Sequence, residues 1–111
     1  MSSDLNMEES ALKTIKKELK EIFAKIEEDK ESFDSLKDNL KKHRLAQTSE
    51  KMISSADEMI RKYEFQLQML RGNTLDSRSK FEQDLTKLKQ KMTEARTKYF
   101  QMEEQARLFA T

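Results

Sequence analysis

The chain of 111 residues contains no cysteine, no proline, no tryptophan and a single glycine, Gly72. Without cysteine it has neither a disulfide framework nor thiolate ligands for a metal. Aromatic residues make up only 7% of the chain, and the near absence of glycine and proline leaves few signals for tight turns. This composition is typical of long helices and provides little for strands or ordered loops.

Long apolar runs are also missing. The N-terminal sequence MSSDLNMEES has no apolar core segment, so it does not resemble a secretory signal peptide. Nowhere do about 18 apolar residues follow one another, so the sequence predicts no membrane-spanning helix. From these two absences we expect a soluble, intracellular chain.

Neither sign of charge is in clear excess, because 22 basic residues face 21 acidic ones for a net charge of +1. Charged residues nevertheless make up 39% of the chain, and disorder is the competing interpretation of such a composition. It is disfavoured because the apolar residues are periodic and the charges nearly cancel. The near-neutral balance also argues against nucleic acid as the main partner.

Apolar residues recur at steps of three and four along three segments, which is the spacing of one helix face. The first seam is interrupted by Asp29, where we expect the packing to be loosened or exposed to water. Its apolar members are Leu12, Ile15, Leu19, Ile22, Ile26, Phe33, Leu36 and Leu40. The middle seam is Met52, Ala56, Met59, Tyr63, Leu67 and Leu70, widened by Ile53 and Ile60. The last is an unbroken heptad seam of Phe81, Leu85, Leu88, Met92, Ala95, Tyr99, Met102, Ala106 and Phe109.

Two turns are expected between these segments. Gly72 or Asn73 can adopt the left-handed conformation that ends a helix. The apolar seam also fails between Leu40 and Met52, where the basic residues 41–44 suit a helix C-terminus and Thr48 or Ser49 can cap the next helix. The sequence therefore predicts a first turn between residues 42 and 48.

The fold class predicted from these patterns is all-α, an antiparallel up-down-up three-helix bundle with left-handed, coiled-coil-like packing. Its helices would span about 6–42, 48–71 and 75–109, after a flexible N-terminus at residues 1–5. Asn6 followed by Glu9 has the spacing of a capping box at the first helix start. The alternative is a long helical hairpin or dimeric coiled coil, in which the chain turns only at Gly72.

Residues with catalytic or metal-binding potential are sparse. The one histidine, His43, lies in a basic cluster at a predicted helix end, where a role in charge capping is favoured. A carboxylate-bridged metal site in a bundle needs Glu-x-x-His pairs on facing helices, and a single histidine excludes that pattern. No glycine-rich phosphate loop exists, and the serine pairs at residues 2–3 and 54–55 have no histidine near them in sequence to activate them. We therefore predict no enzyme activity, no catalytic residues, no metal and no cofactor.

Several apolar residues lie outside the narrow seams. A three-helix core can absorb some of them, and those that stay exposed together would form a patch for a partner. The predicted partner-binding residues are Ile53, Ile60, Phe65, Phe100 and Leu108. The last segment also has a mild positive bias, but interleaved acidic residues indicate a solvated face with ion pairs one helical turn apart.

Three segments stand out in order: ELKEIFAKI in the first expected helix, TSEKMISSADEMIRKYEFQLQML before the glycine, and FEQDLTKLKQKMTEARTKYF in the third. Together they resemble the N-terminal three-helix (Habc-type) domain of Qb-SNAREs, closest to the novel plant SNARE group and more distantly to the Vti-type proteins. The closing QARLFAT is similar to the short exit that follows the third helix in these proteins. The resemblance implies a regulatory domain in vesicle trafficking and membrane fusion, at the cytoplasmic face of endomembranes.

In that family a SNARE motif and a C-terminal membrane anchor follow the three-helix domain, and neither is recognisable here. We therefore expect an excised domain that is a monomer and binds other proteins. The family implies two mechanisms: folding back on the protein's own SNARE motif, or docking trafficking adaptors or tethers. The charge-rich surface, without a long apolar stripe, favours adaptor docking.

Two other classes remain open from the sequence. A folding chaperone similar to tubulin-binding cofactor A is also a charge-rich three-helix bundle of comparable length, although shared architecture does not determine function. A coiled-coil scaffold subunit, whose seam is completed by other chains, is the third possibility.

Overall fold

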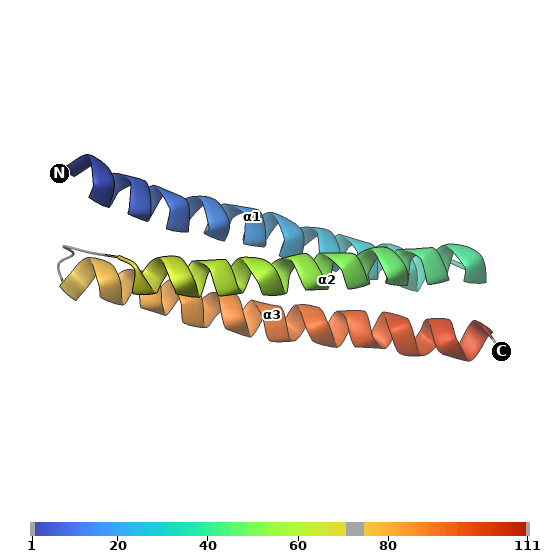
Figure 1. Ribbon diagram of the computed structural model, residues 1–111. Helices are drawn as coiled ribbons and strands as arrows, with labels where there is room; N and C mark the ends of the chain where they lie inside the picture. Colours follow the sequence, from blue (N-terminus) through green and yellow to red (C-terminus); the bar gives the residue numbers. More distant parts are fainter. Residues whose placement is uncertain (1, 71–74, 111) are drawn as a thin grey trace.

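The computed structural model describes residues 2–70 and 75–110, and within them the chain forms three α-helices and no strand. These are α1 (Ser2–Ser35), α2 (Asn39–Gln68) and α3 (Leu75–Ala110). The helices lie side by side along most of their lengths, and each contacts the other two (Figure 1). The prediction of an all-helical, three-helix fold is thus confirmed, and the alternative with a single bend is wrong.

Ion pairs between helices show in which relative direction neighbouring helices run. Along α2 and α3 the residue numbers change in opposite senses, through the pairs Glu64–Lys89 and Asp57–Arg96. Along α1 and α3 they rise together, through the pairs Lys16–Asp84 and Glu27–Lys98. Consequently the start of α1 and the start of α3 lie at one end of the molecule, and the C-terminus lies at the other (Figure 1).

The first turn lies at residues 36–38, so its predicted position between residues 42 and 48 is wrong. Asp38 is the N-cap of α2, because its Oδ1 accepts hydrogen bonds from the main-chain N–H groups of Leu40 at 2.9 Å and Lys41 at 3.3 Å. These bonds satisfy donors that have no partner within the first turn of a helix. Thr48 lies inside α2, where its hydroxyl donates to the carbonyl of Arg44 at 3.0 Å, and it caps nothing.

The other predicted boundaries agree with the structure to different degrees. α1 begins at Ser2, so residues 2–5 are helical and the predicted helix start at Asn6 is wrong, whereas the flexibility expected of residues 1–5 stays a prediction. α2 ends at Gln68 with Met69 as C-cap, slightly before the predicted residue 71. α3 matches its predicted range to within one residue at the C-terminal end. The left-handed conformation predicted for Gly72 or Asn73 falls outside the described residues.

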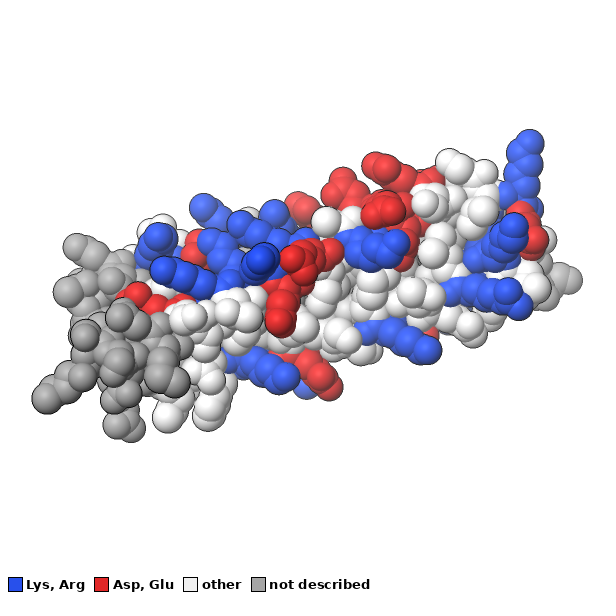
Figure 2. Space-filling model, turned by 90° about the horizontal axis from the view of Figure 1, so that it is seen from above, with Lys and Arg blue, Asp and Glu red and all other residues white. Residues whose placement is uncertain are grey.

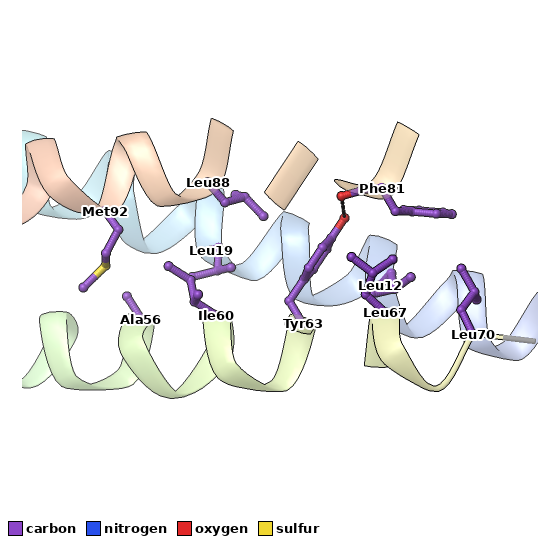
Figure 3. Close-up of a cluster of buried hydrophobic side chains, with 10 residues drawn as sticks. All are labelled: Leu12, Leu19, Ala56, Ile60, Tyr63, Leu67, Leu70, Phe81, Leu88 and Met92. Atoms are coloured by element: carbon purple, nitrogen blue, oxygen red, sulfur yellow. Dashed lines mark hydrogen bonds between the residues drawn. The ribbon is translucent and has the colours of Figure 1, made fainter. Parts of the chain in front are cut away.

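Buried apolar side chains form two clusters along the axis. The larger cluster, in which all three helices participate, is drawn in Figure 3. Its members are Leu12, Leu19, Ala56, Ile60, Tyr63, Leu67, Leu70, Phe81, Leu88 and Met92. The smaller one, nearer the first turn and the C-terminus, contains Phe33, Ala46, Met102 and Ala106. Each large side chain buried in this way contributes about 1.5–3 kcal/mol relative to exposure.

The seam of α1 is interrupted by a polar residue, Asp29. The expectation that this position is exposed to water is wrong. Asp29 is only 4% exposed, and its Oδ1 pairs with the Lys25 ammonium at 3.2 Å. Its Oδ2 is buried and has no hydrogen-bond partner among the described residues. Buried Ser49 on α2 is a second polar residue in the core, and its hydroxyl lies 3.9 Å from the sulfur of Met102.

Candidate functional site

The five predicted partner-binding residues have different environments. Ile60 is 7% exposed and belongs to the larger core cluster, and Ile53 is half-buried against the same cluster. Both therefore contribute to packing, because a three-helix core is wider than one seam. Phe65 and Phe100 are each 59% exposed and Leu108 is 69% exposed.

The three exposed residues do not form one patch. Phe65 lies on α2 next to Glu64, whose carboxylate pairs with Lys89 of α3. From Lys89 to Phe100 the axis of α3 advances about 16 Å at 1.5 Å per residue. Phe100 and Leu108 both lie towards the C-terminal end of α3, about 12 Å apart along its axis, whereas Phe65 is displaced along the length of the molecule.

A hollow of about 210 Å³ lies between α2 and α3 close to Phe100, and we call it the α2–α3 groove. It forms where two alanines of the small core cluster, Ala46 and Ala106, face each other and leave space between the helices. Its remaining lining residues are His43, Gln47, Glu50, Tyr99, Glu103 and Arg107. A second, shallower hollow is lined by Phe100, Glu103, Glu104 and Arg107. Because Glu103 and Arg107 line both, Phe100 and the groove form one continuous surface.

Hydrogen bonds and ring contacts hold the walls of this groove. The Arg107 guanidinium donates to Glu103 at 2.8 Å, and the side chains of His43 and Gln47 are hydrogen-bonded at 3.3 Å. The rings of Tyr99 and Phe100 are 5.5 Å apart and tilted by 44°, a favourable arrangement for aromatic pairs. The groove thus combines an aromatic pair with a charged rim.

The electrostatics of the groove keep Tyr99 protonated. Burial raises the pKa of the Tyr99 phenol, and the carboxylates of Glu103 and Glu50 raise it further. A tyrosine hydroxyl is already neutral at physiological pH; the raised pKa keeps it protonated further into the alkaline range, where it can serve both as donor and as acceptor.

Sequence reasoning missed most of the groove. His43 was predicted to be a charge at a helix end, but it lies inside α2 and faces the groove. Tyr99 and Ala106 were assigned to the seam of the third helix, and nothing distinguished them from ordinary core residues. The available signal was the small size of Ala106, together with that of Ala46 on the facing helix, since two small residues leave space between helix axes.

The groove is lined by few residue types that take part in catalysis. Its single histidine stands beside an amide and carboxylates, with no serine or threonine among the lining residues. Within the part of the chain whose side chains are described, no three histidine or carboxylate side chains gather closely enough to hold a metal ion. Across the same part, no helix is sufficiently long and apolar to cross a membrane. The arrangement is suited to binding a side chain or short segment of another protein.

Searches of family models, curated proteins and solved structures found no match to this chain.

Proposed function

We propose that this chain is a non-catalytic protein-interaction domain, of the Habc type found at the N-terminus of Qb-SNAREs, that docks trafficking adaptors or tethers. The observation that carries the proposal is the exposed aromatic ring of Phe100 beside the α2–α3 groove. Protein interfaces are centred on aromatic anchors and surrounded by a polar rim. Glu103 and Arg107 provide such a rim here.

The distribution of apolar surface favours a short ligand over the protein's own SNARE motif. A long amphipathic helix needs a continuous row of apolar contacts at steps of three and four residues. The large apolar side chains that are exposed on the described surface are instead scattered over two helices. They are Leu40, Phe65, Met69, Phe100 and Leu108. A ligand that anchors on Phe100 and Leu108 and ends in the groove fits this pattern better.

The proposal includes finer features of the assembly. The bundle is an antiparallel up-down-up arrangement with left-handed, coiled-coil-like packing, which the order of the cross-helix ion pairs and the heptad spacing of the third seam support. The domain acts as a monomer within a longer membrane-anchored protein, at the cytoplasmic face of endomembranes. These last features rest on the resemblance of the sequence to the family.

Titration calorimetry with purified partners tests the function. The partners are a panel of trafficking adaptor domains and a peptide of a Qb-SNARE motif. We expect one adaptor to bind, and the Phe100→Ala/Leu108→Ala variant to weaken that binding at least about tenfold, since truncated anchors typically cost more than 1 kcal/mol each. The matched control is Leu40→Ala/Met69→Ala, which also removes two exposed apolar side chains and should leave the affinity nearly unchanged. Binding to the SNARE-motif peptide alone, with no adaptor bound, would contradict adaptor docking.

Light scattering coupled to size exclusion tests the proposed monomer separately. A mass that stays at one chain over a tenfold range of concentration is expected. A dimer or larger species would favour the coiled-coil scaffold and remove support for a self-contained domain.

A further inference from the structure

The first halves of α1 and α3 carry an excess of positive charge, although the whole chain is nearly neutral. Residues 9–20 contain four lysines and two glutamates, whereas residues 21–35 contain two lysines and six acidic residues. Residues 78–91 of α3 contain five basic and two acidic residues. Both basic halves lie at the same end of the molecule (Figure 1), so their charges add on one side.

Cross-helix contacts show that the two basic halves share a face. The ammonium of Lys16 pairs with the Asp84 carboxylate at 3.0 Å across α1 and α3. Further along the two helices, Lys20 of α1 and Lys91 of α3 both line one shallow hollow between them. Residues three, four or seven positions apart lie on the same side of a helix, which places further lysines beside these contacts. We call the resulting set the lysine face: Lys13, Lys17, Lys20, Lys80, Lys87 and Lys91.

No ion pair neutralises the charges of the lysine face within the described residues, although Glu94 lines the same hollow as Lys20 and Lys91 and Asp84 is paired with Lys16. All six side chains are exposed, and none forms an ion pair with a carboxylate in the described part of the chain. Seen from above, blue side chains gather in the half of the molecule next to the grey atoms (Figure 2). The lysine face is therefore a site of positive potential on a chain of net charge +1.

We propose that the lysine face binds the anionic, phosphate-bearing surface of a membrane. The lysines extend over about 10 Å of α1 and about 16 Å of α3, at 1.5 Å per residue, which makes a broad face with no enclosed pocket. None of the large exposed apolar residues of the described surface belongs to it, so binding is electrostatic and peripheral, without insertion. The molecule measures 59 × 19 × 18 Å and can lie along a flat surface on this side.

The composition of the face favours a membrane over nucleic acid. Lysine is a compact point charge, whereas the planar guanidinium of arginine matches phosphate groups in a bidentate manner and is the preferred group for nucleic-acid recognition. Arg78, the arginine of the basic half of α3, is paired with Glu82, and Phe23, the aromatic residue in the hollow beside Lys20 and Lys91, is half-buried, so no fully exposed ring is offered for base stacking. A planar array of lipid phosphates, in contrast, can be bound by several lysines whose ammonium groups reach the same plane. This inference rests on the charges of the chain and stands independently of the proposed adaptor docking.

Co-sedimentation of the purified chain with lipid vesicles tests the proposal. We expect binding to vesicles that contain about 30% phosphatidylserine and none to neutral phosphatidylcholine vesicles, because juxtaposed lysines are attracted to anionic headgroups. Raising the salt from about 0.1 M to about 0.5 M should release the protein, since exposed charges are screened. Each lysine lost should lower the partition coefficient about fivefold.

A charge-matched pair of variants locates the effect. The test variant is Lys13→Gln/Lys20→Gln/Lys87→Gln/Lys91→Gln, and it should lose more than about a hundredfold in vesicle binding. The control is Lys41→Gln/Lys51→Gln/Arg61→Gln/Lys62→Gln, which removes the same charge from exposed positions of α2 that form no ion pair with a described residue. It should lose at most about fivefold. Circular dichroism melting curves establish that both variants are folded.

Three outcomes would overturn the proposal. Equal loss in the two variants would show that net charge alone drives binding. Tighter binding to a duplex oligonucleotide than to the anionic vesicles would assign the face to nucleic acid. Calorimetric binding of inositol hexakisphosphate that is as tight as vesicle binding and is lost in the test variant would assign it to a free phosphate ligand.

Discussion

The hydroxyl of Tyr63 donates a hydrogen bond to the main-chain carbonyl of Phe81, at 3.1 Å, and so links α2 to α3 inside the core. Tyr63 is fully buried, and its ring lies among the side chains of all three helices (Figure 3). A buried hydroxyl without a partner is costly, so the position of the Phe81 carbonyl constrains how α3 can be placed along α2. The bond lies near the connection between the two helices and helps to fix their register.

Replacing Tyr63 with phenylalanine should lower the free energy of unfolding by about 1 kcal/mol, the typical net value of an intramolecular hydrogen bond. The loss stays modest because the ring and its contacts remain. Urea denaturation followed by circular dichroism measures it. Tyr99→Phe serves as the control, since Tyr99 is only half-buried, and its effect should stay within about 0.5 kcal/mol. Equal effects at the two positions would show that the Tyr63 bond has no special role.

Stability should decline at alkaline pH through Tyr63. Burial raises the pKa of the Tyr63 phenol, and the carboxylate of Asp84 raises it further. Above about pH 10, the ordinary pKa of tyrosine, the unfolded chain releases this proton while the folded chain retains it. The free energy of unfolding therefore falls as pH rises, by at most about 1.4 kcal/mol per pH unit from this group. Below pH 10 the contribution is fully present.

The matched comparison is again Tyr63→Phe, measured by urea denaturation between about pH 9 and about pH 11, a range that spans the ordinary tyrosine pKa. Lysines titrate over the same range in both proteins, so the difference between the two curves isolates Tyr63. The variant should lose stability less steeply. Parallel curves would mean that the phenol ionises in the folded chain as it does in the unfolded one.

Asp29 should limit the stability of the bundle. Its carboxylate is buried with one oxygen unpartnered, and burial of a charge is costly unless its bonds are complete. Its one ion-pair partner, Lys25, is exposed, and the hydrogen bond and charge of Asp29 raise the pKa of that ammonium. Asp29→Leu should therefore raise the free energy of unfolding by about 1–3 kcal/mol.

Glu28→Leu is the control for this substitution, because Glu28 is an exposed neighbour on the same turn and should change stability by less than about 0.5 kcal/mol. Removing the partner in Lys25→Gln should instead destabilise the chain, since the buried carboxylate of Asp29 would lose its ion-pair partner. If Asp29→Leu is itself destabilising, the carboxylate has a partner or role that outweighs the cost of its burial.

The number and type of helices could be predicted from sequence because three apolar seams persist over many turns. The first turn could not be placed, since the apolar spacing of Leu36 and Leu40 continues across it without glycine or proline. The sequence shows no apolar seam between Leu40 and Met52, but in the structure the buried face of α2 continues there through Ala46 and Ser49. A small residue and a polar one carry no hydrophobic signal, although both lie in the core.

The candidate site was predictable only in part, for a related reason. Phe65 and Phe100 lie outside their seams and are exposed, whereas Ile60 also lies outside the narrow seam but is buried. A residue outside the seam can still be buried, because two neighbouring helices cover more of the surface of a third helix than the narrow seam alone. The α2–α3 groove depends on two alanines from segments that are far apart in sequence, Ala46 and Ala106, and only the packed helices bring them together.

The N-cap of α2 provides a direct test of where the chain turns. Asp38→Ala removes the acceptor for two main-chain N–H groups and should lower the free energy of unfolding by about 1 kcal/mol. Thr48→Ala is the informative comparison, because Thr48 would be the cap if the turn lay between residues 42 and 48. Inside α2 its hydroxyl only bonds back to the preceding turn, so this change should cost less than about 0.5 kcal/mol, and alanine's higher helix propensity can make it stabilising. A larger loss at Thr48 than at Asp38 would place the turn at the later position and overturn the assignment of residues 36–38.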